Sequence, residues 1–213
     1  MDIFGVMYSP FTARVVLAAR HKGIKHKLSM PKDGTKTPAY LKLNPLGKAP
    51  VMKDGATVLF ESGVIVEYLD AQYKKTRIVP TNPKAMAQAR LIAALFAEYV
   101  QPHIFALWGQ ADPAKRDQAL VDGKLAEINK GLDIIEGRLK AAPYAAGDKF
   151  TIADCYAVPV LFWLDALLTP VGVADPLGGR KKLKKYAAKV RKDKLLGGVL
   201  AEMAEGLKQM QNR

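Results

Sequence analysis

The chain has 213 residues, of which 49% are hydrophobic, and a formal net charge of +13 at pH 7. This length is enough for one large domain or two small ones with a buried core. No run of about 18 apolar residues exists, so we expect no membrane-spanning segment. The single cysteine, Cys155, excludes an internal disulfide and favours a reducing, cytoplasmic setting. The scattered histidines give no metal-ligand spacing, so no metal is expected.

The first 80 residues alternate between short strand-like and helix-like segments. Gly23 ends the first helical pattern, and Asp54-Gly55 is a hairpin turn signal. The first strand–helix–strand unit should be a right-handed parallel crossover. The predicted elements, in chain order, are a strand over 3–8, a helix over 11–22, a strand over 24–30, a helix over 36–43, strands over 51–53 and 57–60, and a helix over 62–73.

Strand signals disappear after a short linker that contains Pro80 and Pro83. Pro102 should kink the helix that contains it. The remaining helical patterns cover 84–110, 115–140, 152–168 and roughly 180–210. We therefore predict an α/β plus all-α chain, with an α/β module over 1–75, a linker over 76–83 and an all-helical module over 84–213.

A proline stands at the entry of the third predicted strand, in the block Asn44-Pro45-Leu46-Gly47-Lys48-Ala49-Pro50-Val51. Proline removes a donor from the strand ladder, so it is unusual at that position. A cis Pro50 would explain it by turning the preceding backbone toward a ligand. An ordinary tight turn that uses the freedom of Gly47 explains the block equally well.

The third predicted helix opens with Glu61-Ser62-Gly63. Ser62 is expected to be its N-cap. A helix N-terminus with a serine hydroxyl can receive a carboxylate, and an adjacent glutamate can receive an amine. The pair would then recognise the α-amino acid end of a ligand. A plain helix cap beside a surface acid is the alternative.

Ser9 lies where the first strand gives way to the first helix, in the stretch VMYSPFTARV. Pro10 suits the first helical position, which makes Ser9 the N-cap. The Ser9 oxygen would accept a bond from the helix backbone, and its proton could be donated outward to a thiolate near the positive helix end. Tyr8 is expected to belong to the strand and to serve in packing. Ser9 and Thr12 occupy the cysteine positions of a Cys-Pro-x-Cys frame, so any reactive thiol must arrive with the ligand.

The highest density of positive charge lies in residues 174–195, with nine basic and two acidic residues. Such a run could bind nucleic acid or an anionic surface. Tyr186 is the only aromatic residue nearby, so no stacking platform is evident. A solvated helix face is the favoured interpretation, and nucleic-acid binding is not expected.

On four motifs in characteristic order and spacing, the sequence resembles a cytosolic glutathione transferase of the serine type, similar to the phi, zeta or theta classes or a bacterial branch. The match spans the whole chain. The motifs are Ser9 at the first strand–helix turn, the Asn44-Pro45-x-Gly47-x-x-Pro50 block, Glu61-Ser62, and Gly147-Asp148-x-Phe150-Thr151-x-x-Asp154.

The resemblance implies a thioredoxin-like domain that binds glutathione as co-substrate, followed by an all-helical domain, in a cytoplasmic homodimer with a detoxification role. Ser9 would donate a hydrogen bond to the glutathione thiolate, which attacks a hydrophobic electrophile. The remaining implied contacts are Val51 with the cysteinyl part, Glu61 and Ser62 with the γ-glutamyl end, and Lys36 and Lys48 with the glycine carboxylate.

Two further expectations concern the helical module. Thr151 to Asp154 forms a capping box at a helix start, and Cys155 should lie in the core. The electrophile pocket is expected between the two domains. Its candidate residues are Phe11, Tyr99, His103 and Trp108, for which ordinary helix packing is the alternative.

Other functions remain open on the sequence. A non-catalytic relative could use the same fold for binding, although the intact Ser9, Pro50, Glu61 and Ser62 argue against it. A glutathione-dependent isomerase or oxidoreductase of the same superfamily is a further alternative, and the missing cysteine at position 9 argues against the oxidoreductase. The residues do not select among aromatic substitution, conjugate addition, ether cleavage and isomerisation.

Overall fold

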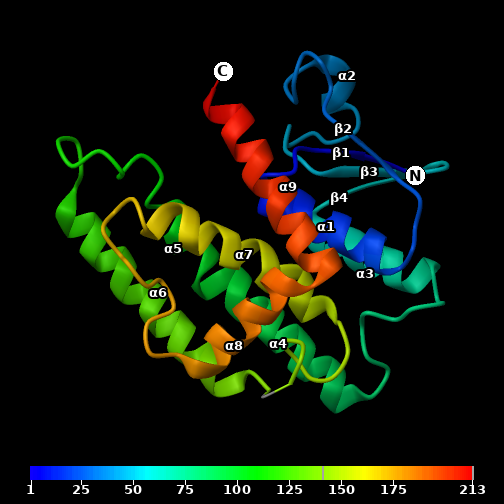
Figure 1. The fold of residues 1–213 in the computed structure, drawn as a ribbon. Coiled ribbons are helices and arrows are strands. Elements are labelled where there is room, and N and C mark those ends of the chain that lie inside the picture. Colours follow the sequence, from blue (N-terminus) through cyan, green and yellow to red (C-terminus); the bar gives the residue numbers. More distant parts are fainter. Residues whose placement is uncertain (141, 213) are drawn as a thin grey trace. The chain divides into compact units, whose positions relative to one another are not determined.

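The computed structural model describes residues 1–140 and 142–212, which group into two compact units (Figure 1). The first unit comprises Met1–Val79 and the segment from Asp193 onward, and the second comprises Pro80–Lys192. Compared with the predicted ranges, this grouping extends the first stretch from 75 to Val79 and places the C-terminal helix in the N-terminal unit.

A four-stranded mixed sheet forms the first unit, in the order β2-β1-β3-β4. Strand β1 pairs in parallel with β2, which confirms the predicted parallel unit, and antiparallel with β3; β3 and β4 form the predicted hairpin. Ile3 in β1 lies opposite Leu28 in β2 and Met52 in β3, so apolar side chains meet in one row. The strands are β1 (Asp2–Phe4), β2 (Lys27–Ser29), β3 (Val51–Asp54) and β4 (Thr57–Phe60).

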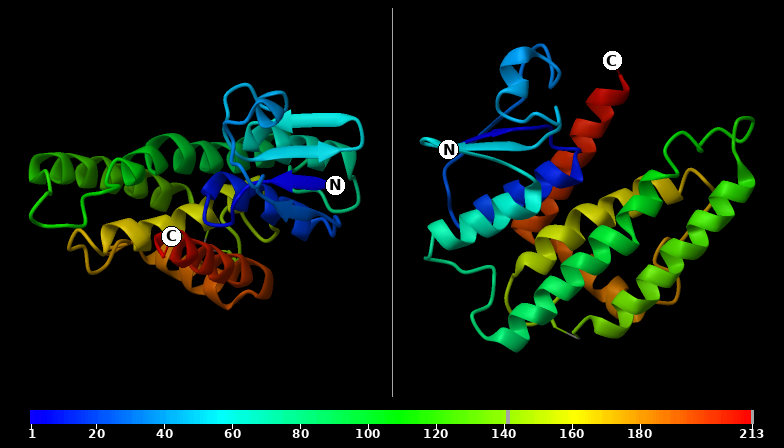
Figure 2. Two further views of the ribbon diagram at one scale, coloured as in Figure 1. Left: turned by 90° about the horizontal axis from the view of Figure 1, so that it is seen from above. Right: turned by 180° about the vertical axis from the view of Figure 1, so that it is seen from behind.

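Four helices complete the first unit: α1 (Pro10–His21), α2 (Pro38–Leu41), α3 (Ser62–Gln72) and α9 (Lys194–Gln211). Helix α1 is the central one, because it packs against both α3 and α9 (Figure 2). Its residues from Thr12 to Ala19 are all buried. The element order from β1 to α3 is the predicted thioredoxin-like β-α-β-α-β-β-α.

The first strand is shorter than predicted, because it ends at Phe4. Gly5 still donates to the Ser29 carbonyl, but the chain then turns, and the Ser9 N–H bonds to the Val6 carbonyl at 3.1 Å. A Cβ on Gly5 would lie 2.4 Å from Thr12 Oγ1, so only glycine allows this close approach of the strand end to α1. The prediction that Tyr8 belongs to a strand is therefore wrong.

The second unit is all-helical, with α7 buried along most of its length and packed against α4. No helix within the described ranges 1–140 and 142–212 is both long and apolar enough to cross a membrane. The helices of this unit are α4 (Pro83–Tyr99), α5 (Gln101–Phe105), α6 (Gln118–Arg138), α7 (Ile152–Leu168) and α8 (Lys181–Lys192).

Two helices predicted as continuous are in fact divided. The segment over 84–110 breaks between Tyr99 and Gln101, because Pro102 has no N–H to continue the helical ladder and instead serves in the first turn of α5. The segment over 180–210 breaks at Asp193, whose carboxylate accepts from the N–H groups of Leu195 and Leu196 and so starts α9.

The predicted capping box is confirmed at the start of α7. Asp154 is fully buried and accepts from the N–H of Thr151 at 2.8 Å, the N–H of Ala145 at 2.9 Å and the hydroxyl of Tyr186 at 2.8 Å. Burial raises the pKa of Asp154, although these hydrogen bonds oppose the shift. Cys155 is buried, as predicted.

A buried ion pair anchors the C-terminal part of α3 to the end of α1. Asp70 binds Lys22 Nζ at 2.8 Å, with both side chains 2% exposed or less, and also accepts the Ile78 N–H at 2.7 Å. Burial raises the pKa of Asp70, but the hydrogen bonds from Lys22, Ile78 and Val79 outweigh it, so the net pKa is lowered.

We predict that Asp70→Asn lowers the free energy of unfolding by about 3–5 kcal/mol at pH 7, because it leaves the buried Lys22 ammonium without its counter-charge. Since the folded pKa is depressed, the stabilisation is present above the ordinary aspartate pKa of about 3.9 and disappears as the pH falls through the lowered value. Urea unfolding from pH 2 to 7 measures both effects.

The matched control is Asp175→Asn, which removes the exposed pair with Lys184 and should lower the unfolding free energy far less than Asp70→Asn does. Equal losses for the two variants would contradict a structural role for Asp70.

Candidate active site

A cavity of about 350 Å³ opens on the first unit, where the turn before β3 meets the starts of α1 and α3. It brings together four of the residues singled out by sequence: Lys48, Pro50, Glu61 and Ser62. Phe11, an electrophile candidate, also lines it and is 40% exposed. Asn44 and Ala49 complete the lining.

Ser9 is the N-cap of α1, as predicted. Its Oγ accepts the Thr12 N–H at 3.4 Å, and Pro10 follows at the first helical position. The backbone N–H bond uses one oxygen lone pair and leaves the hydroxyl proton to be donated elsewhere. A group placed there also experiences the positive end of the α1 dipole.

The Ala49–Pro50 peptide bond is cis, and the tight turn at Gly47 is present as well, with the Gly47 N–H donating to the Asn44 carbonyl at 2.9 Å. Three further hydrogen bonds hold the loop before Pro50. Asn44 Nδ2 donates to the Lys48 carbonyl at 2.7 Å, the Tyr40 hydroxyl donates to the same oxygen at 3.1 Å, and Asn44 Oδ1 accepts the Leu46 N–H at 3.0 Å. Val51 follows Pro50 as the buried first residue of β3.

The two lysines predicted to meet a carboxylate are both exposed, near the same loop. Lys48 lines the cavity. Lys36 Nζ donates to the Leu46 carbonyl at 3.4 Å and lies close to Gly47, where a Cβ would come within 2.8 Å of the ammonium. Gly47 also adopts a φ of 58°, so glycine suits this position for two reasons.

The prediction that Ser62 caps α3 is wrong. Glu61 precedes the helix with φ 69° and ψ 106° and makes no side-chain cap, and Ser62 is the first helical residue. Ser62 is only 4% exposed, and its Oγ accepts a bond from Arg14 Nη1 at 3.0 Å. The positive φ of Glu61 is unusual for a residue with a side chain and holds an exposed carboxylate at the cavity wall.

Arg14 was missed in the reading of the sequence. It is 4% exposed, and its guanidinium lies 5.3 Å from the centroid of the Phe11 ring. Its position was the signal in the sequence, because Arg14 is the one cation in the buried stretch of α1 from Thr12 to Ala19. Buried arginines are rare unless they bind something.

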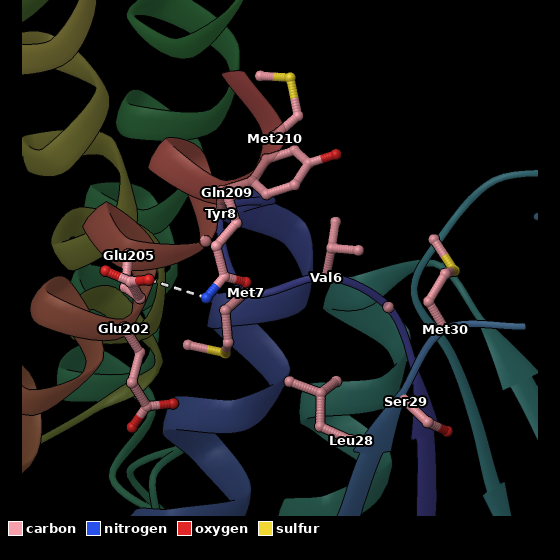
Figure 3. A pocket seen from close by; sticks show the side chains of 12 residues that line it. Val6, Met7, Tyr8, Leu28, Ser29, Met30, Glu202, Glu205, Gln209 and Met210 are labelled. Atoms are coloured by element: carbon pink, nitrogen blue, oxygen red, sulfur yellow. Dashed lines mark hydrogen bonds between the residues drawn. The ribbon is translucent and has the colours of Figure 1, made fainter. Parts of the chain in front are cut away.

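A second cavity, of about 440 Å³, lies within the first unit between the β1–α1 segment, the end of β2 and α9 (Figure 3). Tyr8 lines it. Gly206 of α9 allows the approach, since a Cβ there would be 3.2 Å from the Tyr8 nitrogen. The apolar lining consists of Val6, Leu28 and three methionines, Met7, Met30 and Met210.

Two carboxylates stand on the α9 side of this second cavity. Glu202 receives both terminal nitrogens of Arg20, at 2.6 and 2.9 Å, and Glu205 accepts from Gln209 at 2.8 Å. This cavity could not be predicted from the sequence, because the residues of α9 were assigned to the helical module.

The other electrophile candidates are in the second unit. Tyr99 is 53% and Trp108 48% exposed, and the Trp108 ring lies 5.4 Å from that of Trp163. His103 is half-buried in the last turn of α5. That these residues share a pocket with Phe11 stays a prediction. Within the described residues, no three or more His, Cys, Asp or Glu side chains group so as to hold a metal ion.

Two family models match the chain: "Glutathione S-transferase, N-terminal domain" over residues 3–77 and "Glutathione S-transferase, C-terminal domain" over residues 87–193. The chain belongs to the glutathione S-transferase family. Among curated relatives, glutathione S-transferase F13 of Arabidopsis thaliana is 30% identical and a glutathione S-transferase of Silene vulgaris is 31% identical. The alignments cover 76% and 77% of this chain and 80% and 82% of the relatives.

Solved structures agree with this assignment. Glutathione transferase F7 from Populus trichocarpa superposes with a TM-score of 0.80 at 25% identity, over 95% of this chain and 98% of that one. Glutathione S-transferase-I bound with lactoylglutathione also gives 0.80 at 25% identity, over 94% and 98%. Glutathione transfer is therefore the activity class of this glutathione transferase, and glutathione is its co-substrate.

We predict that the backbone at Glu61 is strained enough to be detected by substitution. Glu61→Gly should be more stable than Glu61→Ala by about 1 kcal/mol, because glycine adopts a positive φ without the clash of a Cβ. Urea unfolding of the two variants measures the difference.

Glu67, an exposed residue inside α3, is the control. There the order should reverse, with Glu67→Ala the more stable by about 1 kcal/mol. The same order at both positions would show that Glu61 is not strained.

Proposed function

We propose that this transferase activates the thiolate of glutathione through Ser9 for attack on a hydrophobic electrophile. The observation that carries the proposal is the Ser9 cap: its oxygen is occupied by the Thr12 N–H, and its proton is available at the start of α1. The serine is a hydrogen-bond donor in this scheme and forms no covalent intermediate.

The interaction energies available at Ser9 are large enough to lower the pKa of the glutathione thiol. Lowering a thiol pKa by about two units requires a preference for the thiolate of roughly 2.7 kcal/mol. A hydrogen bond to a charged group contributes about 1.5–3 kcal/mol, and a helix N-terminus about 0.3–1 kcal/mol. Ser9 and the end of α1 together can therefore account for an ionised thiol near neutral pH.

The 350 Å³ cavity supports a definite placement of the rest of glutathione. The carboxylate of the γ-glutamyl end would bind the Ser62 hydroxyl, and its amine would bind the Glu61 carboxylate. The cysteinyl part would pair with the backbone of Val51, beside the cis Pro50. The glycine carboxylate would face Lys36 and Lys48.

We assign the electrophile to the 440 Å³ cavity, whose lining includes Tyr8, the residue before Ser9. Three thioethers and the Tyr8 ring offer a soft, polarisable lining that suits aromatic and other apolar compounds. Phe11, Tyr99, His103 and Trp108 remain candidate contacts from the sequence.

The compartment, the oligomeric state and the other ligands of the enzyme are part of the same proposal. We infer a cytoplasmic homodimer, in keeping with the family resemblance of the motifs, that needs no metal and binds neither nucleic acid nor membrane. Aromatic substitution, conjugate addition, ether cleavage and isomerisation share the ionised thiol as first requirement, so the Ser9 site serves each of them.

We expect Ser9→Ala to lower turnover at least tenfold, because it removes about 1.5–3 kcal/mol of stabilisation at the reacting sulfur. Glutathione affinity should change only a few-fold, since the other contacts remain. Steady-state kinetics and calorimetry separate the two effects, and a thiolate absorbance titration should show a raised pKa for bound glutathione.

Tyr8→Phe is the comparison variant, because it removes the neighbouring hydroxyl while keeping the ring in its cavity. A fully active Ser9→Ala together with an inactive Tyr8→Phe would reverse the assignment. A wild-type protein that binds glutathione but activates it toward no electrophile would favour the non-catalytic alternative.

Positive charges near the 350 Å³ cavity should affect glutathione affinity more than positive charges elsewhere on the protein. Lys36→Ala combined with Lys48→Ala should weaken glutathione binding roughly threefold to tenfold, as expected for two exposed ion pairs. The charges on α8 belong to the other unit, and none lines the cavity. Replacing Lys181, Lys182, Lys184 and Lys185 by Ala should leave affinity nearly unchanged at physiological salt, where the Debye length is about 8 Å.

The same quadruple variant should lose any weak, salt-dependent retention on heparin. Loss of glutathione turnover in that variant, with its circular dichroism unchanged, would mean that α8 does not present a merely solvated face.

A further inference from the structure

We propose that Glu205 makes the electrophile cavity selective for charge: it favours apolar electrophiles that carry a cationic group, such as a protonated amine, and disfavours those that carry a carboxylate. The inference rests on the proposed function, which assigns the electrophile to the 440 Å³ cavity, and deepens it by naming the substrate class. Glu205 determines specificity in this scheme and takes no part in activating the thiolate.

The charge of this cavity is opposite to that of the whole chain. The protein has 33 lysines and arginines against 20 aspartates and glutamates. Among the described residues that line the cavity, two are glutamates, Glu202 and Glu205, and none is lysine, arginine or histidine. An anionic wall in a cationic protein attracts cations locally and repels the anions that the overall field would draw in.

Helix α9 supplies the acidic wall with one of its faces. Residues three, four, seven and eight positions apart lie on the same side of a helix. The α9 residues in the lining follow this spacing and are Glu202, Glu205, Gly206, Gln209 and Met210. Because Gly206 has no side chain, this face lies close to the β1–α1 segment: a Cβ there would be 3.2 Å from the Tyr8 nitrogen and 3.7 Å from Met7 Cβ.

The two glutamates differ in how far their charge is compensated. Glu202 receives both terminal nitrogens of Arg20, at 2.6 and 2.9 Å, so a cation already lies against it. In the described part of the chain, the hydrogen-bonding partner of Glu205 is the neutral side-chain amide of Gln209, at 2.8 Å, and Glu205 has no ion pair (Figure 3). The charge of Glu205 is therefore available to a ligand.

The rest of the lining suits the apolar part of such a ligand. Val6, Leu28 and the three methionines form apolar walls, and the thioethers adapt to different shapes. The aromatic ring of Tyr8 can also contact a cation through its face. A carboxylate-bearing compound would meet the same walls but would be repelled by Glu205. Charge therefore distinguishes two ligands that are otherwise alike.

Calorimetry with three S-benzylglutathione conjugates tests the proposal, because each carries the same glutathione part and a benzyl group on its sulfur. The para substituent of the ring is aminomethyl, methyl or carboxylate, so the probes differ in charge. We expect the wild type at low salt to bind the aminomethyl conjugate about tenfold more tightly than the carboxylate conjugate, with the methyl conjugate between them. The kcat/KM values for the matching benzyl chlorides, from which the glutathione sulfur displaces chloride, should follow the same order.

Glu205→Gln removes the charge but keeps an oxygen that can accept from Gln209. It should reduce the ratio of the two affinities to about twofold. Glu205→Lys should invert the preference, and it provides a second measurement if the first variant does not fold. Glu67→Gln is the matched control, because it removes an equal charge from α3, outside the linings of both cavities. It should leave the ratio unchanged.

The inference is overturned if the wild type binds the three conjugates equally, or if a Glu205 variant that is folded by circular dichroism keeps the wild-type ratio. It is also overturned if Glu67→Gln lowers the ratio as much as Glu205→Gln does, since the preference would then come from the overall charge. Failure of the proposed function looks different, because the wild type would then bind neither glutathione nor any of the conjugates.

Discussion

The pairing of α1 with α3 is the constraint on which the site depends. The Arg14–Ser62 hydrogen bond joins the helices near their starts, and the buried Lys22–Asp70 pair joins them near their ends. The two helices therefore run in the same direction, with both N-termini beside the cavity that Phe11 and Ser62 line. Each helix start has a positive dipole end, which favours the binding of anions.

In the proposed mechanism, this arrangement means that the chain needs no nucleophile of its own. Both positions of the Cys-Pro-x-Cys frame hold hydroxyl residues, and Cys155 is buried in the second unit. In that mechanism the protein supplies a donor at Ser9, a carboxylate and a hydroxyl at Glu61 and Ser62, and an apolar cavity that includes Tyr8. The thiol would arrive with glutathione, and the positive helix ends would stabilise its ionised form.

Local sequence signals correctly predicted the features that depend on residues close together in the chain. The Ser9 cap followed from Ser-Pro at a helix start, the Thr151–Asp154 capping box from its spacing, and the hairpin from Asp54-Gly55. The errors arose where neighbouring segments override local preference. Ser62 looked like a cap, but the positive φ of Glu61 makes Ser62 the first helical residue, and its hydroxyl bonds to Arg14 instead.

The sequence by itself determined the order of the elements from β1 to α3, the fold class, the family and most of the residues proposed for glutathione, because each follows from local patterns and short motifs. Only the tertiary structure decided that α9 joins the first unit, that Tyr8 lines a methionine-rich cavity, and that Arg14 bonds to Ser62. These features depend on contacts between segments tens to about 200 positions apart, and no pattern within either segment specifies its partner.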